Sequence, residues 1–213
     1  MTRSDLTHLY FLLDRSGSMQ SIKQDTEGGF AAFIEEQRRG AGECRVTLAQ
    51  FDNAYDVVYR DLPVSVVPPL DLQPRGATAL LDSIGRLAHE AGACLAALPD
   101  DQRPGTVIVA IMTDGLENAS HEWTHAAIRA LVEQQTATYG WEFLYMGADQ
   151  DAIEVGQTLG VHADHAVTYG RGNVDKVMAA TASKVSHLRQ ARLVNAAAPM
   201  RAYTAQERAD SES

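Results

Sequence analysis

Two short stretches of the chain are almost continuously apolar, and they constrain the fold more than any other feature of the sequence. They cover residues 6–13 and 106–112 and consist mostly of bulky aliphatic, aromatic and β-branched residues. Strands that are covered on both faces carry such unbroken runs, whereas a strand with one face in water alternates apolar and polar residues. The two stretches therefore predict the central strands of a mainly parallel sheet.

Shorter β-rich stretches alternate with helical patterns through the rest of the chain. Two of them, at residues 46–51 and 54–60, are joined across Asp52 and Asn53, which predicts an antiparallel hairpin. Further strands are expected at 141–146 and 165–169, and helices at 22–38, 78–98, 121–138, 174–189 and after Asp151. This alternation predicts an α/β fold, doubly wound, with helices on both faces of the sheet.

The composition is that of an ordinary globular domain and excludes some partners. With 213 residues, of which 45% are apolar, the chain can bury a core without a disulfide or a structural metal. The net charge of -10 argues against nucleic acid or an anionic membrane as the main partner.

Cys44 and Cys94 both fall in apolar patterns, so we expect two buried thiols. The N-terminal apolar run is too short for a signal peptide, and we expect a cytoplasmic protein.

Three predicted loops place oxygen-bearing side chains beyond the carboxyl ends of the central strands. Asp14, Ser16 and Ser18 follow the first apolar run, Asp114 follows the second, and Thr78 opens a predicted helix between them. Open parallel sheets bind ligands at this edge, and hard divalent cations such as Mg²⁺ select oxygen ligands. Each residue taken alone could be a helix cap. Together they predict a metal site, whereas a nucleotide site would need a glycine-rich fingerprint or a phosphate loop with lysine, and neither is present.

These five positions resemble the metal-ion-dependent adhesion site (MIDAS) of the von Willebrand factor type A (VWA) domain family. That site combines an Asp-x-Ser-x-Ser loop, a threonine before the second main helix and an aspartate after the fourth strand, and here all five positions are filled. The segments LDRSGSM, RGATALLD and MTDG are similar to family usage, and the resemblance covers roughly residues 5–170. It implies six strands in the order 3-2-1-4-5-6, with strand 3 antiparallel. We expect one VWA domain over 5–190 and a partly disordered extension over 191–213.

The resemblance also implies a function. In the family, Ser16, Ser18 and often Thr78 would contact Mg²⁺ or Mn²⁺ directly, whereas Asp14 and Asp114 commonly act through water. Because mostly neutral ligands leave the ion much of its charge, an open position can accept a Glu or Asp carboxylate from a partner protein. Family members without secretion signals are often intracellular bacterial proteins that work beside ATPases. We therefore expect a metal-dependent protein-interaction module of this type rather than an enzyme.

A second motif offers an alternative function. Residues 121–125 fit H-E-x-x-H, in which His121 and His125 would bind zinc and Glu122 would activate water in a hydrolase. The motif is predicted in the first turns of a helix capped by Ser120. A third ligand would be needed, and the candidates are Glu133, Glu142, His162 and His165, none at a recognisable family spacing.

Three further polar residues lie near the predicted metal site. Glu117 and Asn118 are placed at its rim, where they could select a partner or simply start a helix. Asp82 lies one turn after Thr78, and it could orient that threonine or be an ordinary acid on the helix surface.

Overall fold

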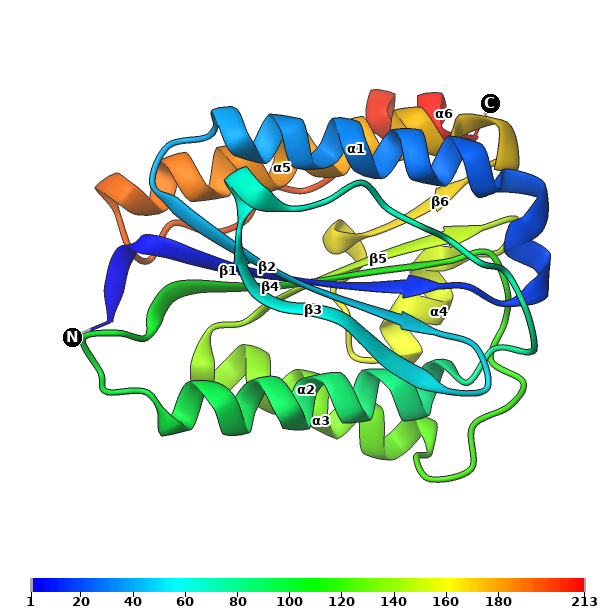
Figure 1. Cartoon of the computed structure of the whole chain (residues 1–213), viewed down its shortest axis with the longest axis horizontal. Helices are drawn as coiled ribbons and strands as arrows, with labels where there is room; N and C mark the ends of the chain where they lie inside the picture. Colours follow the sequence, from blue (N-terminus) through cyan, green and yellow to red (C-terminus); the bar gives the residue numbers. More distant parts are fainter. Residues whose placement is uncertain (1, 213) are drawn as a thin grey trace.

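The computed structural model describes residues 2–212 and contains a six-stranded sheet with the order β3-β2-β1-β4-β5-β6 (Figure 1). The strands are β1 (Arg3–Asp14), β2 (Glu43–Phe51), β3 (Tyr55–Pro63), β4 (Pro104–Thr113), β5 (Glu142–Ala148) and β6 (Ala166–Tyr169). Neighbouring strands are parallel except β3, which pairs antiparallel with β2. The predicted fold class, strand order and hairpin are confirmed.

Helices cover both faces of the sheet, as predicted (Figure 1). One face carries α1 (Lys23–Arg39), α5 (Val174–Val194) and α6 (Ala205–Glu212), and the other carries α2 (Leu80–Ala97), α3 (His125–Tyr139) and α4 (Ala152–Thr158). Short 3-10 turns occur at Gly17–Ile22, Val64–Val66, Ala163–His165 and Arg171–Asn173. No helix within residues 2–212 combines the length and the apolar character that crossing a bilayer requires.

Strand β1 shows why its sequence is continuously apolar. Phe11 and Leu13 point into the core beneath α1 and α5, whereas Tyr10 and Leu12 point into the core beneath α2 and α3. The ring of Phe11 meets that of Phe30 edge-on, with 5.2 Å between the ring centroids, a favourable aromatic geometry. Two-sided burial in the middle of the sheet therefore replaces the usual alternation of apolar and polar residues.

Two local predictions differ from the structure. Cys44 is buried as expected, but Cys94 is exposed, because in the last turns of α2 the neighbouring Leu95, not Cys94, packs against the core. Helix α3 begins at His125 and is capped by Thr124, whose hydroxyl accepts a hydrogen bond from the Ala127 N–H at 3.2 Å. Ser120 is therefore not the cap.

The C-terminal segment packs against the rest of the chain as far as residue 212. Within it, α6 contacts α5 and β6, and the predicted domain bounds and partial disorder over 191–213 stay predictions. Lys184 on α5 is buried and donates to the carbonyl oxygen of Asp164 at 2.9 Å and to that of Arg201. Arg208 on α6 donates to the carbonyl oxygens of Ala163 and Ala166 at 2.8 and 2.7 Å. These contacts order the segment through its side chains, although its sequence is polar.

Candidate metal site

The site lies at the carboxyl edge of the sheet, where the ends of β1 and β4 are neighbours. Leu13 pairs with Met112 in the parallel register, so Asp14 and Thr113 leave the sheet side by side. The chain after β1 crosses to the start of α1 at this edge, and the chain after β4 forms the long loop before α3 at the right of Figure 1. The topology thus brings together loops that are about 100 residues apart in the sequence.

Asp14 is a buried carboxylate held by neutral hydrogen-bond donors. Its Oδ1 accepts from the Ser16 N–H at 2.6 Å, and its Oδ2 accepts from the Thr113 hydroxyl at 2.6 Å. Burial raises the pKa of Asp14 to about 6, because the hydrogen bonds from Thr113 and Ser16 offset only part of the lost hydration. The side chain is fixed in orientation, and no basic residue within the described part of the chain forms an ion pair with it.

Ser16, Ser18 and Asp114 form a chain of oxygen atoms beside Asp14. The hydroxyl oxygens of Ser16 and Ser18 are 3.1 Å apart, and the Ser18 hydroxyl donates to Asp114 Oδ1 at 2.6 Å. Ser16 and Asp114 are buried, whereas Ser18 is exposed at the rim. The loop after β1 and the loop after β4 are therefore joined through polar side chains rather than through apolar packing.

The Thr78 hydroxyl reaches the same place from a third loop. A Cβ atom added to Gly115 would lie 3.2 Å from Thr78 Oγ1 and 3.7 Å from Ser18 Oγ. The two hydroxyls thus face one small space over Gly115 that a methyl group would fill. Asn118 holds Thr78 there, because its Oδ1 accepts from the Thr78 N–H at 2.9 Å and its own N–H donates to the Thr78 carbonyl at 3.1 Å.

All five predicted site residues are therefore close together, and every side-chain group they offer is an oxygen. Hydroxyl and carboxylate oxygens suit a hard divalent cation such as Mg²⁺ or Mn²⁺, and the space over Gly115 is where the hydroxyls of two loops converge. The residues present fit such an ion. Within residues 2–212, no three His, Cys, Asp or Glu side chains cluster as metal ligands would, because hydroxyls supply most of this site.

Glu117 and Asp82 hold the neighbouring loop in place. The Glu117 carboxylate accepts from the N–H groups of Leu81 and Ser120 at 2.9 and 2.7 Å. Burial raises the pKa of Glu117, but these hydrogen bonds outweigh it, so the pKa lies below the usual value. Asp82 accepts from the N–H groups of residues 121–123 and does not touch Thr78 in any hydrogen bond of the described chain. Asn118, Glu117 and Asp82 thus support the site by fixing the loop that carries Asp114.

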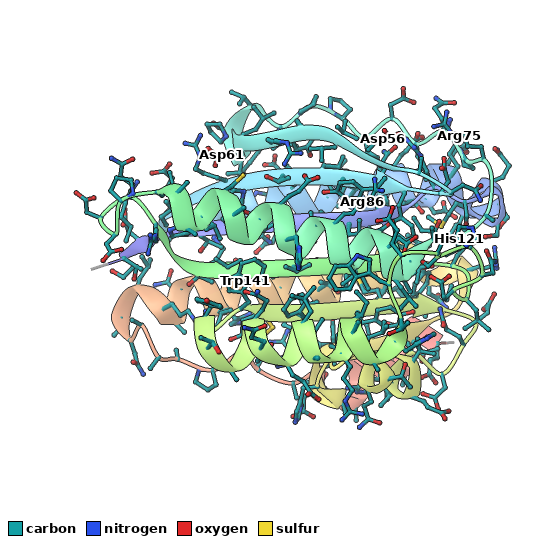
Figure 2. The ribbon with its side chains drawn as sticks, turned by 90° about the horizontal axis from the view of Figure 1, so that it is seen from below. Asp56, Asp61, Arg75, Arg86, His121 and Trp141 are labelled. Carbon is teal, nitrogen blue, oxygen red and sulfur yellow. The ribbon has the colours of Figure 1, made fainter. Side chains whose placement is uncertain are left out.

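The H-E-x-x-H residues do not have the helical geometry that the zinc motif requires. His121 and Glu122 lie in the bend before α3, and His125 is the first helical residue. The two histidines are therefore not one turn apart on one helix face, and Glu122 pairs with Arg86 at 2.7 Å. Figure 2 labels His121 at the same end of the molecule as Arg75. The arrangement gives no support to the zinc hydrolase alternative.

Sequence analysis missed Arg171, which follows β6 and contacts the site. Its Nη1 donates to Asp114 Oδ2 at 2.8 Å, and its Nε donates to Asp149 Oδ2 at 2.8 Å. A basic residue at the carboxyl end of a predicted strand was the only available signal. That signal does not say which acid the arginine meets, because Arg171 and Asp114 are 57 positions apart.

A second polar cluster lies beside the site, at the end of β2. Asp52 accepts from Arg15 Nε at 2.9 Å and from Arg75 Nε at 2.7 Å through the same Oδ2, and Arg15 also contacts Asp56. Burial raises the pKa of Asp52, but the hydrogen bonds and charges of its partners outweigh that effect and lower the pKa overall. Figure 2 shows Asp56 and Arg75 near each other at this end of the molecule. Gly76, at a φ of 69°, continues this loop, and its carbonyl oxygen accepts a hydrogen bond from the Gly17 N–H at 3.1 Å.

The comparisons with known proteins identify the fold. No protein-family model matches the chain, and no curated protein matches its sequence. Among solved structures, the von Willebrand factor domain of the pilus tip protein Mfa5 from Porphyromonas gingivalis matches with a TM-score of 0.60 and 12% identity, over 86% of this chain and 96% of that one. Proximal thread matrix protein 1 from the mussel byssus matches with a TM-score of 0.59 and 13% identity, over 85% and 46%.

A third match is a von Willebrand factor type A protein from Catenulispora acidiphila, with a TM-score of 0.56 and 15% identity over 84% of this chain and 42% of that one. One structure of the mussel protein is described as having a zinc-occupied MIDAS motif. The chain spans less than half of the mussel and Catenulispora proteins. The chain thus has the α/β fold of VWA domains, and at these identities the likeness concerns the fold alone.

Proposed function

We propose that the chain is a VWA domain whose edge site binds Mg²⁺ or Mn²⁺ through Asp14, Ser16, Ser18, Thr78 and Asp114. The observation that carries the proposal is the convergence of hydroxyl and carboxylate oxygens from three loops on the space over Gly115. The buried carboxylate of Asp14 adds negative charge that no ion pair of the described chain neutralises. The zinc-occupied MIDAS of a protein with the same fold supports a divalent metal in this class of site.

The proposed function is a metal-dependent protein-interaction module that captures a Glu or Asp side chain of its partner. Such a site supplies a positively charged, oxygen-ligated ion with a free position, and Ser16, Ser18 and Thr78 would hold it. Because these ligands are neutral, an external carboxylate can neutralise the remaining charge. Names of proteins with this fold, a pilus tip protein and a byssal matrix protein, are consistent with roles in protein assemblies.

The surroundings of the site fit a protein partner. Leu116 follows Gly115 directly and is 61% exposed, so an apolar contact is available next to the site. The net charge of -10 opposes an acidic partner at long range, which makes the binding depend on the local cation. From the sequence resemblance we further propose a non-enzymatic bacterial protein of the cytoplasm. In this proposal the partner belongs to an ATPase-associated assembly, and neither nucleic acid nor a membrane is bound.

The first test measures metal binding directly. The electron paramagnetic resonance signal of free Mn²⁺ should fall on titration with the protein, and Mg²⁺ should restore it by competition. Ser16→Ala and Asp114→Ala should abolish or strongly weaken Mn²⁺ binding, whereas Asp100→Ala, which changes an exposed acid remote from the five residues, should not. Equal Mn²⁺ binding by all four proteins would show that the site is not where we place it.

The second test asks for the partner. Affinity capture from an extract of the source cell is compared in Mg²⁺, in EDTA and with the Asp14→Ala variant. A protein retained only by the wild type in Mg²⁺, and released by replacement of one of its own acidic residues, would support carboxylate capture. A partner held equally in all three conditions would contradict it.

A further inference from the structure

Arg171 connects the ends of four strands at the metal-site edge. It lies in the turn Arg171–Asn173 between β6 and α5, and its guanidinium contacts Asp114 after β4 and Asp149 after β5. Its Nη1 also lies 2.8 Å from the Ser21 hydroxyl and 3.2 Å from the Ser18 carbonyl oxygen, in the segment after β1. One side chain thus links the last strand to the loops that hold the proposed metal ligands.

The guanidinium neutralises one of the two carboxylates of the site. Asp114 Oδ1 accepts from the Ser18 hydroxyl, and Asp114 Oδ2 accepts from Arg171. The Asp114 side chain is 0% exposed, so its ion pair with Arg171 is screened little by solvent. Asp14 differs, since its partners are an N–H group and a hydroxyl.

Asp149 shares the Arg171 guanidinium with Asp114. Its carboxylate accepts from Arg171 Nε, and its backbone has a φ of 51°, in the left-handed region that few residues other than glycine and asparagine adopt readily. The Asp149 N–H donates to the Tyr169 carbonyl at 3.1 Å, which ties the end of β5 to the end of β6. A backbone conformation that costs energy is thus maintained at the residue that shares the guanidinium with Asp114.

The formal charges then leave room for one external anion. Asp14 and Asp114 contribute two negative charges and Arg171 one positive charge, while the half-exposed carboxylate of Asp149 is screened by water. With a divalent cation added, the site would carry one net positive charge. Without Arg171, the two carboxylates would balance the cation by themselves.

We propose that Arg171 makes the metal site depend on an external carboxylate, by sharing Asp114 with the divalent cation and so weakening the binding of the cation alone. This inference rests on the proposed function and specifies how that site is regulated. Repulsion between the guanidinium and the cation lowers metal affinity, and a partner carboxylate relieves it. By linkage, the carboxylate raises the affinity for the metal by the same factor as the metal raises the affinity for the carboxylate.

The test titrates Mn²⁺ alone, and Mn²⁺ with acetate as a carboxylate probe against chloride at equal ionic strength. Arg171→Gln should bind Mn²⁺ alone about tenfold more tightly than the wild type, because Asp114 loses its competing cation. Acetate should tighten Mn²⁺ binding by the wild type and have a smaller effect on Arg171→Gln. Arg129→Gln, which removes a half-exposed arginine paired with Glu133 on α3, is the matched control for net charge and should behave as the wild type.

A second variant acts in the opposite direction and covers the case in which Arg171→Gln does not fold. Asp149→Asn keeps a residue that tolerates positive φ but removes the acid that shares the guanidinium, so Mn²⁺ binding should weaken about threefold. Glu154→Gln on α4 removes one exposed acid and serves as its control. Mn²⁺ binding that is unchanged or tighter in Asp149→Asn contradicts the proposal.

The outcomes separate this inference from the proposed function. If the wild type binds Mn²⁺ and folded Arg171→Gln binds it equally or more weakly, the role of Arg171 is overturned and the metal site stands. If Arg171→Gln binds Mn²⁺ and the wild type binds only with acetate, the inference is supported in its strongest form. If no variant binds Mn²⁺ under any condition, both proposals fail.

Discussion

Asp14 and Asp52 lie at the ends of neighbouring strands and are both buried. They differ in whether a basic side chain neutralises the carboxylate. Asp52 has two arginines on one carboxylate oxygen and the Ala54 N–H on the other. Asp14 has a hydroxyl and an N–H group and no basic partner in the described chain. The pKa of Asp52 is accordingly lowered, whereas burial raises that of Asp14 to about 6.

This difference separates a structural cluster from the proposed metal site. The charge of Asp52 is compensated inside the chain, so the cluster joins the loops after β1, β2 and β3 and needs nothing else. The charge of Asp14 is oriented but not compensated, and the neighbouring oxygens of Ser16, Ser18 and Thr78 face the same space. A cation from solution would relieve the cost of burying Asp14. Four measurements test the contrast between Asp14 and Asp52.

The largest expected effect is on stability. Asp52→Asn should lower the free energy of unfolding by about 3 kcal/mol, because it leaves the buried guanidinium of Arg15 with only the exposed Asp56 as an acidic partner. Asp14→Asn should change it by less than about 1 kcal/mol in metal-free buffer, since the amide removes an unpaired buried charge but loses one hydrogen-bond acceptor. Urea unfolding in EDTA measures both, with the exposed Asp100→Asn as the control. Equal losses of unfolding free energy in Asp14→Asn and Asp52→Asn would contradict the distinction between the two carboxylates.

The second effect is stabilisation by metal. At a Mg²⁺ concentration of about 100 times Kd, the wild type should gain about 2.7 kcal/mol of unfolding free energy over EDTA. Asp52→Asn is less stable in EDTA, but Mg²⁺ should raise its unfolding free energy by the same amount. Mg²⁺ should raise the unfolding free energy of Asp14→Asn only a little. A reversed order of the two increments in urea unfolding would place the metal at the Asp52 cluster instead.

The third effect is on pH dependence in the absence of metal. The folded pKa of Asp14 is about 6, above its ordinary 3.8, so the folded state holds more protons between these values. The stability of the wild type relative to Asp14→Asn should therefore fall by about 2 kcal/mol as the pH rises from about 4 to 6. The pKa of Asp52 is lowered, so stability relative to Asp52→Asn should instead be lost as the pH falls below about 4. If the two stability differences changed with pH in the same direction, the contrast between Asp14 and Asp52 would be contradicted.

The smallest effect on stability is expected for Gly115→Ala. The added methyl group would lie 3.2 Å from Thr78 Oγ1, in the space where the hydroxyls converge, so Mn²⁺ affinity should fall about tenfold, or about 1.4 kcal/mol. The metal-free stability should change by less than about 0.5 kcal/mol, as for most substitutions away from the core. Gly28→Ala on α1, which meets nothing within 4 Å, is the control and should leave Mn²⁺ affinity unchanged.

Much of the fold and of the candidate site could be predicted because the signals are local. Continuous apolar runs predicted β1 and β4, since two-sided burial requires apolar residues at every position. Parallel strands end at a common edge, so the residues at their ends had to lie close together: Asp14 accepts from Thr113, and Asp114 accepts from Ser18. The antiparallel hairpin followed from the short turn at Asp52 and Asn53.

The errors have tertiary causes. The bend before α3 persists because Asp82, on another helix, accepts the N–H groups of His121, Glu122 and Trp123, and a helix beginning at Ser120 is not formed. Cys94 has an apolar neighbourhood in sequence but is exposed on the last turns of α2, where Leu95 packs against the core instead.

The sequence by itself determined the order of the elements, the oxygen chemistry of the site and the edge at which it lies, because periodicity and strand direction are properties of short segments. Only the tertiary structure decided which charges are compensated. Arg15 meets Asp52, and Arg171 meets Asp114 across 57 positions, while Asp14 meets neither. Ion pairs form between whichever groups the packing of the sheet and helices brings within a few ångströms, and sequence spacing carries no record of that distance.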